Sequence, residues 1–231
     1  NQHFLQYFYN EKIIPSWNLV NFCEVDKFAA TSYCAIHGVN PVLNIGDITK
    51  VDENNMLPFN MICGGSPCQD FSIAGKQAGS GWTCKDCTNE DGSPFTYNPL
   101  TVHWSVRDKC PHCGSKNLDK TRSSLLVEWL RVVRANKPAW GIYENVKNIV
   151  GKSFRNTFDM FIEELHEYGY NTYWKVLNAK DFGIPQNRER LYLVIIRKEL
   201  DNGKFDLPDG FESDITMYDI LEDEENVPDK Y

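Results

Sequence analysis

The residues with the clearest chemical potential are a cysteine and the turn before it, in the stretch Gly64-Gly65-Ser66-Pro67-Cys68. The two glycines let the backbone turn sharply and let a ligand approach closely, and Pro67 stiffens the approach to the thiol. Because a thiolate is a strong nucleophile, Cys68 is a candidate for covalent catalysis. The alternative is a small buried hydrophobe, which is the usual fate of a free cysteine.

A carboxylate and two arginines could act together with that thiol. Glu144 follows the apolar run 139–143, and Arg188 and Arg190 stand at the start of another apolar run. A glutamate can hydrogen-bond a ring nitrogen and activate the ring toward attack, and an arginine can hold a carbonyl oxygen and lower the pKa of a thiol. Together with Cys68, these groups indicate an active site rather than a core.

Four further cysteines form two close pairs, Cys84-x-x-Cys87 and Cys110-x-x-Cys113, with 22 residues between the pairs. Two such knuckles can supply four thiolates in a tetrahedron around one Zn²⁺. This spacing predicts a closed structural zinc site without an open position for chemistry. His112, which lies between two of the expected ligands, is a weaker alternative ligand.

The elements that must position these groups follow from the apolar periodicity, which predicts an α/β domain. Strands are expected at 18–25, 42–48, 61–63, 139–143, 170–177 and 190–196, and helices at 27–37, 125–137 and 154–168. In open α/β sheets, ligands bind outside the carboxyl ends of the strands. We therefore expect Cys68 and Glu144 at the same edge of one sheet.

The helix surfaces can be predicted as well. The helix at 27–37 should bury Phe28, Ala29, Tyr33 and Ile36, because these residues share one face. The next helix should have Glu128, Arg131 and Arg134 outside and bury six apolar residues, which are Leu125, Leu126, Trp129, Leu130, Val132 and Val133. Cys23, Cys34 and Cys63 lie in apolar runs, and core packing would explain them.

Two acids near the start of the chain could bind a nucleotide-like cofactor. Glu24, at the end of a predicted strand, could accept a hydrogen bond from a ribose hydroxyl, although spacing alone favours a solvent-exposed capping acid. Asp47 could accept from an adenine amino group, but a turn aspartate is more common.

Charge is distributed unevenly along the 231 residues, whose net charge is -8. Residues 206–231 hold ten acids and one base, so the remainder has 23 bases and 22 acids. Residues 107–137 hold eight bases against three acids. This basic stretch could contact nucleic-acid phosphates, and the alternative is that it is simply a solvated surface. No apolar run has membrane-spanning length and no signal peptide is recognisable, so we expect a cytoplasmic protein without a membrane partner.

The three catalytic stretches resemble, in order, motifs of the DNA (cytosine-5) methyltransferases of prokaryotic or phage restriction-modification type. They are the stretch 64–72, Glu144-Asn145-Val146 and Gln186-Asn187-Arg188-Glu189-Arg190. Residues 22–26 and 46–49 are similar to the cofactor motifs of this family, and the resemblance extends over 18–197. It implies a class I S-adenosylmethionine-dependent methyltransferase fold, which is a Rossmann-like mixed sheet flanked by helices, here with an inserted zinc-ribbon-like module.

The resemblance also implies roles for individual residues. Cys68 would attack C6 of a flipped-out cytosine in double-stranded DNA, with Glu144 at N3 and the exocyclic amine, Arg190 at O2, and Arg188 steadying the Cys68 loop. S-adenosylmethionine would donate the methyl group, in a protein expected to be a monomer. The residues implied to bind this cofactor are Glu24, Asp47, Ile48, Pro67 and Leu125. A tRNA methyltransferase of the same family, or a truncated, non-catalytic zinc-bearing nucleic-acid binder, are the alternatives.

We expect four parts along the chain. These are the first part of the catalytic domain (1–81), the zinc module (82–120), the rest of the catalytic core (121–200) and an acidic run-in to a target-recognition domain (201–231). The Phe-x-Gly-x-Gly cofactor loop with which the family opens is not in this sequence. The expectation is therefore a piece of a longer enzyme that by itself binds S-adenosylmethionine weakly.

Overall fold

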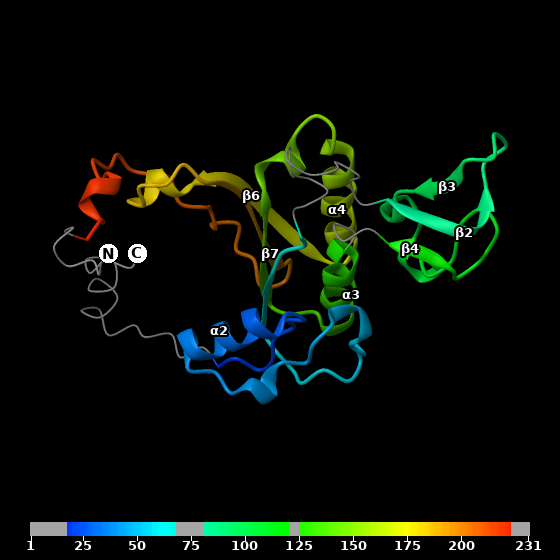
Figure 1. Ribbon diagram of the computed structural model, residues 1–231, viewed down its shortest axis with the longest axis horizontal. Helices are drawn as coiled ribbons and strands as arrows, with labels where there is room; N and C mark the ends of the chain where they lie inside the picture. The colour runs from blue at the N-terminus through cyan, green and yellow to red at the C-terminus, as the bar shows by residue number, and fades with distance from the viewer. Residues whose placement is uncertain (1–17, 68–80, 121–124, 223–231) are drawn as a thin grey trace, which may run out of the picture.

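A computed structural model of the protein describes residues 18–67, 81–120 and 125–222 (Figure 1). Its main sheet has four strands in the order β1-β5-β7-β6. They are β1 (Met61–Gly64), β5 (Trp140–Val146), β6 (Tyr170–Asn178) and β7 (Glu189–Arg197). β1 runs parallel to β5, whereas β7 is antiparallel to both β5 and β6. The predicted mixed α/β sheet with flanking helices is thus confirmed.

Helices α3 (Leu126–Asn136) and α4 (Arg155–Glu167) cover one face of this sheet. Their buried residues form the core with alternate residues of β5 and β7, among them Tyr143 and Leu193. Along β5, Gly141, Tyr143 and Asn145 are buried and the residues between them are half-buried. Since strand side chains alternate between faces, Glu144 and Val146 point away from the helices.

The predicted strands at 18–25 and 42–48 are wrong, because the structure has only a single parallel bridge there, between Phe22 and Asn44. The proline at position 41 lacks an N–H and fixes φ, which favours the 3₁₀ turn η1 (Pro41–Leu43) over a strand. A second 3₁₀ turn, η2 (Ile48–Lys50), follows with Asp47 as its cap.

Helix α2 (Lys27–His37) forms as predicted, but its predicted buried face is wrong. Asp26 caps its first turn, and Gly38 ends it in the left-handed conformation at φ 62°. Phe28 is 80% exposed and Ile36 77%, because nothing in the described part of the chain covers that side of the helix. The expectation of a core environment also fails for Cys63, which is exposed on the outermost strand of the sheet.

A second, antiparallel sheet has the order β3-β2-β4 and projects to one side of the α3–α4 pair (Figure 1). Its strands are β2 (Trp82–Thr88), β3 (Pro94–Tyr97) and β4 (Leu118–Lys120), with the 3₁₀ turns η3 (Pro99–Thr101) and η4 (Trp104–Val106) between β3 and β4. Trp82 and Leu100 belong to the main core. Arg107 and Glu164 of α4 form a buried ion pair with Nη1–Oε1 at 2.9 Å. The second sheet is therefore fixed to α4.

Two further 3₁₀ turns, η6 (Lys147–Val150) and η7 (Ala179–Phe182), follow β5 and β6, and η8 (Met217–Asp219) lies near the end of the described chain. The segment after β7 is largely irregular, and the Phe211 N–H donates to the Asp181 carbonyl. Among the described residues, no helix combines the length and apolar character that crossing a membrane requires.

Candidate active site

Glu144 and Arg190 meet because of the register between β5 and β7. Arg190 pairs with Val146, which lies on the same face of β5 as Glu144. Arg190 therefore reaches Glu144 diagonally, and its Nε lies 3.0 Å from Glu144 Oε1. Its Nη1 donates to the Glu189 carbonyl at 2.8 Å, which fixes the direction of the guanidinium. The result is a carboxylate and an arginine placed side by side on the half-buried face.

The turn after β1 approaches Glu144 so closely that only glycine fits. A Cβ built on Gly65 would lie 2.3 Å from the Glu144 carbonyl oxygen, well inside any normal contact. The sequence suggested that glycine here allows close approach of a ligand. In the structure, the group that comes close is the backbone of the neighbouring strand.

A buried hydrogen-bond network holds the residue that follows this turn. The hydroxyls of Ser66 and Tyr143 lie 2.7 Å apart, and the Asn145 side-chain amide donates to both the Ser66 carbonyl and the Tyr143 hydroxyl at 3.1 Å. Burial raises the pKa of Tyr143, so its hydroxyl keeps its proton and can donate. The network fixes Ser66, and thereby Pro67, relative to β5.

One pocket gathers these groups, and it is lined by Gly65, Ser66, Pro67, Glu144, Asn145, Val146, Arg188 and Arg190. The structure thus brings together Pro67, Glu144, Arg188 and Arg190 among the predicted site residues. Cys68, the predicted nucleophile, lies outside the described residues, one position after Pro67. A carboxylate and two guanidinium groups give this pocket the donors and acceptors that would suit one edge of a polar heteroaromatic ring.

Arg188 owes its position to a residue whose role the sequence did not reveal. Asn178 Oδ1 accepts from the Arg188 N–H at 2.9 Å, and Asn178 Nδ2 donates to Asn187 Oδ1 at 2.7 Å. The Ala179 N–H also donates to the Arg188 carbonyl at 3.1 Å. The loop between β6 and β7 is thus closed at its base by Asn178.

Asn44 is a second residue whose role the sequence did not reveal, and it connects the segments that carry the predicted cofactor residues Glu24 and Asp47. Its amide donates to the Glu24 carbonyl at 2.9 Å and its oxygen accepts from the Glu24 N–H and from the Gly46 N–H, both at 3.0 Å. Asn44 therefore ties together the two short segments that carry the acids. A spacing of 20 residues between Asn44 and Glu24 gave no local signal of this contact.

Both acids also take part in local capping. Glu24 Oε1 accepts from the Asp26 N–H at 2.8 Å, and Asp47 Oδ1 accepts from the N–H and hydroxyl of Thr49. The hydrogen bonds from Thr49 lower the pKa of Asp47, which keeps this carboxylate ionised and able to accept. Ile48 begins the turn η2 and Leu125 directly precedes α3.

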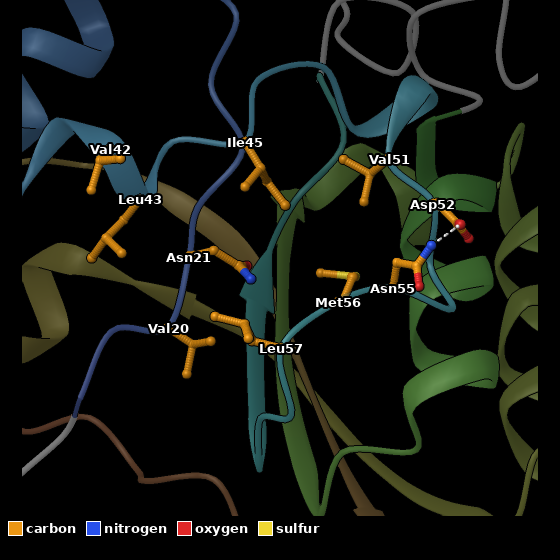
Figure 2. Close-up of a pocket in the computed structure, with 10 residues that line it drawn as sticks. All are labelled: Val20, Asn21, Val42, Leu43, Ile45, Val51, Asp52, Asn55, Met56 and Leu57. Carbon is orange, nitrogen blue, oxygen red and sulfur yellow. Dashed lines mark hydrogen bonds between the residues drawn. The ribbon is translucent and has the colours of Figure 1, made fainter.

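A separate cavity of about 350 Å³ lies beside these segments (Figure 2). It is mostly apolar, and its lining residues are Val20, Asn21, Val42, Leu43, Ile45, Val51, Asp52, Asn55, Met56 and Leu57. None of the predicted cofactor residues lines it. Val51 and Asp52, however, directly follow the turn that begins at Ile48.

The four paired cysteines come together beside the second sheet, where Cys84 and Cys87 belong to β2 and Cys110 and Cys113 to the connection before β4. Their sulfur atoms all lie within 4.8 Å of one another, with Cys84 and Cys113 at 3.6 Å and Cys87 and Cys110 at 3.7 Å. A tetrahedron of sulfurs around Zn²⁺ has edges of about 3.8 Å, since Zn–S is about 2.3 Å. The N–H groups of Asp86 and His112 point at Cys84 Sγ and Cys110 Sγ. This donor set fits a zinc ion.

The sequence is similar to a family of known proteins over most of its length. Residues 8–86 and 104–231 match the C-5 cytosine-specific DNA methylases. This match confirms the resemblance that the catalytic motifs predicted. The residues between the two matched ranges, 87–103, lie within the second sheet and its connections.

Individual relatives agree with this match. The orphan methyltransferase M.SPBetaI of Bacillus phage SPbeta is 36% identical over 185 residues, which are 80% of this chain and 40% of that protein. The type II methyltransferase M2.ScrFI of Lactococcus lactis subsp. cremoris is 35% identical over 188 residues, or 81% of this chain and 41% of that protein. The chain thus spans about two fifths of the length of these curated relatives.

Among solved structures, a DNMT2 variant from Spodoptera frugiperda matches with a TM-score of 0.55 and 17% identity, covering 98% of this chain and 58% of that one. At this identity the likeness concerns the fold alone. It agrees with the mixed sheet and its flanking helices.

Proposed function

Because the chain belongs to the C-5 cytosine-specific DNA methylase family, we propose that the full-length protein methylates C5 of cytosine in double-stranded DNA. DNA is the substrate of this family, and its members depend on S-adenosylmethionine. The observation that carries the proposal is the contact of Glu144 with Arg190 in a pocket that Pro67 also lines. Cys68 follows Pro67 directly in the sequence.

The chemistry begins at C6, because C5 of cytosine is by itself a poor nucleophile. The Cys68 thiolate attacks C6 and converts the ring into an enamine that is nucleophilic at C5. Glu144 in its acid form donates to N3 and accepts from the exocyclic amine, and Arg190 donates to O2, so the negative charge that builds on the ring is stabilised. Once C5 has accepted the methyl group that the bound cofactor would supply, which would leave S-adenosylhomocysteine, a base removes the C5 proton and the Cys68 thiolate is expelled by elimination. Since C6 is inaccessible inside a duplex, the base must be flipped out.

S-adenosylmethionine supplies an electrophilic methyl group when it is bound. Glu24, Asp47, Ile48, Pro67 and Leu125 are the residues proposed to hold it. Support comes from Asn44, which joins the Glu24 and Asp47 segments, and from the ionised state of Asp47. Two carboxylates fixed in this way are suitable acceptors for the hydroxyl and amino groups of a nucleoside.

A structural Zn²⁺ bound by Cys84, Cys87, Cys110 and Cys113 is the second part of the proposal. Its support is the fit of the sulfur–sulfur distances to a zinc tetrahedron. The proposed organisation keeps the zinc module at 82–120, between the parts of the catalytic domain at 1–81 and 121–200, with a run-in at 201–231, in a monomeric enzyme.

Trapping the covalent adduct tests the function. A duplex with 5-fluorocytosine at the target position has no C5 proton to lose, so the adduct should persist on a denaturing gel and map to Cys68. Cys68→Ser should form no adduct, whereas Cys63→Ser, a change on β1 close by in sequence, should form it normally. An adduct at another cysteine, methylation by Cys68→Ser, or modification of tRNA instead of DNA would overturn the proposal.

A further inference from the structure

Arg131 on α3 holds a segment that is distant in sequence and close to the proposed cofactor residues. Its Nη2 donates to the Ile48 carbonyl at 2.7 Å and its Nη1 to the Val51 carbonyl at 2.9 Å. Nη1 also contacts the Glu53 carboxylate. The Arg131 side chain thus binds three acceptor groups within the six residues from 48 to 53.

The guanidinium is itself held in place by acids. Its Nε donates to Glu128 Oε2 at 2.7 Å, one helical turn earlier on α3. Burial, the largest influence, would lower the pKa of Arg131, but hydrogen bonds and charges of Glu128 and Glu53 outweigh it and raise the pKa. Glu128 is buried although the helix pattern predicted it outside, since it is paired with Arg131 and faces Lys120 Nζ at 3.8 Å. The Arg131 guanidinium is therefore held in one orientation, with its Nη atoms toward the backbone of residues 48–53.

The segment that Arg131 holds has little regular structure of its own. The turn η2 covers three residues, and its closing hydrogen bond, from the Val51 N–H to the Ile48 carbonyl, is long at 3.4 Å. Both carbonyls that Arg131 binds belong to this turn or its end. A second residue of α3 also binds this segment, because the Asn136 side-chain amide donates to the Glu53 carbonyl at 2.9 Å.

We propose that Arg131 is a positioning residue for cofactor binding, which sets the backbone from Ile48 to Glu53 so that Asp47 and Ile48 can contact the adenine. The inference rests on the proposed function, since it assumes that S-adenosylmethionine binds at these residues. A lysine could not replace the arginine, because an ammonium group is a point charge and cannot bridge two carbonyls and two carboxylates as a planar fork does.

Arg134 provides a matched control on the same helix. Its side chain is 25% exposed, against 21% for Arg131, and it also lies near Glu53, at 3.8 Å. Its guanidinium, however, stacks over Trp104 at 4.2 Å and is not seen to bind the carbonyls of Ile48 or Val51 in the described structure. Loss of either arginine removes one charge from α3, and only Arg131 should affect the 48–53 backbone.

The test compares Arg131→Lys, Arg131→Ala and Arg134→Ala in the full-length enzyme. We expect Arg131→Lys to raise the KM and the calorimetric Kd for S-adenosylmethionine about tenfold, as for loss of one charged hydrogen bond, and Arg131→Ala to raise them further. The kcat at saturating cofactor and the KM for DNA should change less than about twofold, and Arg134→Ala should leave all constants similarly close to wild type. Hydrogen exchange at Val51 and Glu53 should accelerate only in the Arg131 variants.

The possible failures can be separated. A wild-type enzyme that methylates DNA while Arg131→Lys keeps the wild-type cofactor KM would overturn this inference alone. So would a variant in which kcat falls and the cofactor KM does not change. A wild-type enzyme that binds no S-adenosylmethionine would overturn the proposed function, and this inference with it. If Arg131→Ala does not fold, the Arg131→Lys constants and exchange rates decide.

Discussion

Arg190 Nε lies 3.0 Å from Glu144 Oε1, on neighbouring antiparallel strands that place both side chains on the same face. The two side chains form an ion pair. Both are only partly buried, so the pair is accessible to a ligand. A cytosine presents O2, N3 and the exocyclic amine along one edge: Arg190 can donate to O2, and Glu144 in its acid form can donate to N3 while its other oxygen accepts from the amine. The strand register therefore determines the spacing of the proposed base-binding groups.

Glu144→Gln tests this arrangement. The amide keeps the size of the side chain but cannot transfer a proton to N3, so it cannot stabilise the activated ring as the acid does. We expect kcat to fall by about 10²–10⁴, with little change in the KM for S-adenosylmethionine. Glu189→Gln is the control, because Glu189 pairs with Lys147 at 2.8 Å and does not line the pocket. Equal losses in both variants would argue against a specific role of Glu144.

Two adjacent glycines offer a matched pair of substitutions. In Gly65→Ala the new methyl group would lie 2.3 Å from the Glu144 carbonyl oxygen, whereas in Gly64→Ala it would lie 3.4 Å from Trp129 Cδ1. We expect Gly65→Ala to cost about 1–3 kcal/mol in free energy of unfolding and most of the activity, because β5 and the turn must move apart. Gly64→Ala should cost less than about 1 kcal/mol. Denaturant unfolding and single-turnover rates measure both effects, and equal behaviour of the two variants would contradict the geometry.

The elements with strong periodicity could be predicted from the sequence, because their apolar pattern lies within a short stretch of neighbouring residues. β5, β6, β7, α3 and α4 each carry enough apolar residues in one pattern to identify them, and the cysteine spacing alone indicated a cluster. The segments at 18–25 and 42–48 are short and apolar, but a single bridge is their only strand pairing, so they do not form the predicted strands.

The residues that sequence reasoning missed act over long separations. Asn44 reaches Glu24, Arg131 reaches Ile48 and Tyr143 reaches Ser66, across 20, 83 and 77 positions. Each is a polar side chain whose partner is determined only by the tertiary fold. Glu128 was missed for a different reason, because helix periodicity places it outside and its burial is explained by its ion pairs with the nearby Arg131 and Lys120.

Breaking the buried ion pair between Arg107 and Glu164 of α4 should be strongly destabilising. Arg107 donates from both Nη atoms to Glu164 and from Nε to the Val102 carbonyl at 3.0 Å, while the Tyr168 hydroxyl also donates to Glu164. Arg107→Ala would leave a buried carboxylate without its cation, and should cost about 3–5 kcal/mol. Arg155→Ala, which breaks an exposed pair with Asp159, should cost less than about 1 kcal/mol. Similar losses, measured by urea unfolding, would show that the Arg107 pair is not desolvated.

Asp201 should make stability depend on pH in the acid range. Hydrogen bonds from the Tyr173 hydroxyl, the Asn171 amide and the Gly203 N–H lower the pKa of Asp201 in the folded state. Its stabilising contribution is therefore complete above the unfolded pKa of about 3.9 and is lost as the pH falls through the lower folded pKa. Asp201→Asn should be less stable than wild type at pH 7, and this difference should shrink below about pH 4. Urea unfolding across this pH range measures the difference, and a difference that does not change with pH would contradict the role of these hydrogen bonds.

Zinc removal should unfold the second sheet and disturb the core that it shares with α4. The four sulfurs are close enough to repel one another as thiolates without a cation, and Trp82, which starts β2, is part of the main core. We expect one zinc per chain by mass spectrometry. A strong chelator, or Cys110→Ser with Cys113→Ser, should lower Tm by at least about 5 °C, which corresponds to about 2 kcal/mol in a chain of this size. Cys34→Ser, on α2, should keep both the zinc and the Tm. Less than one zinc per chain in wild type, or zinc retained by the double variant, would exclude the four-cysteine site.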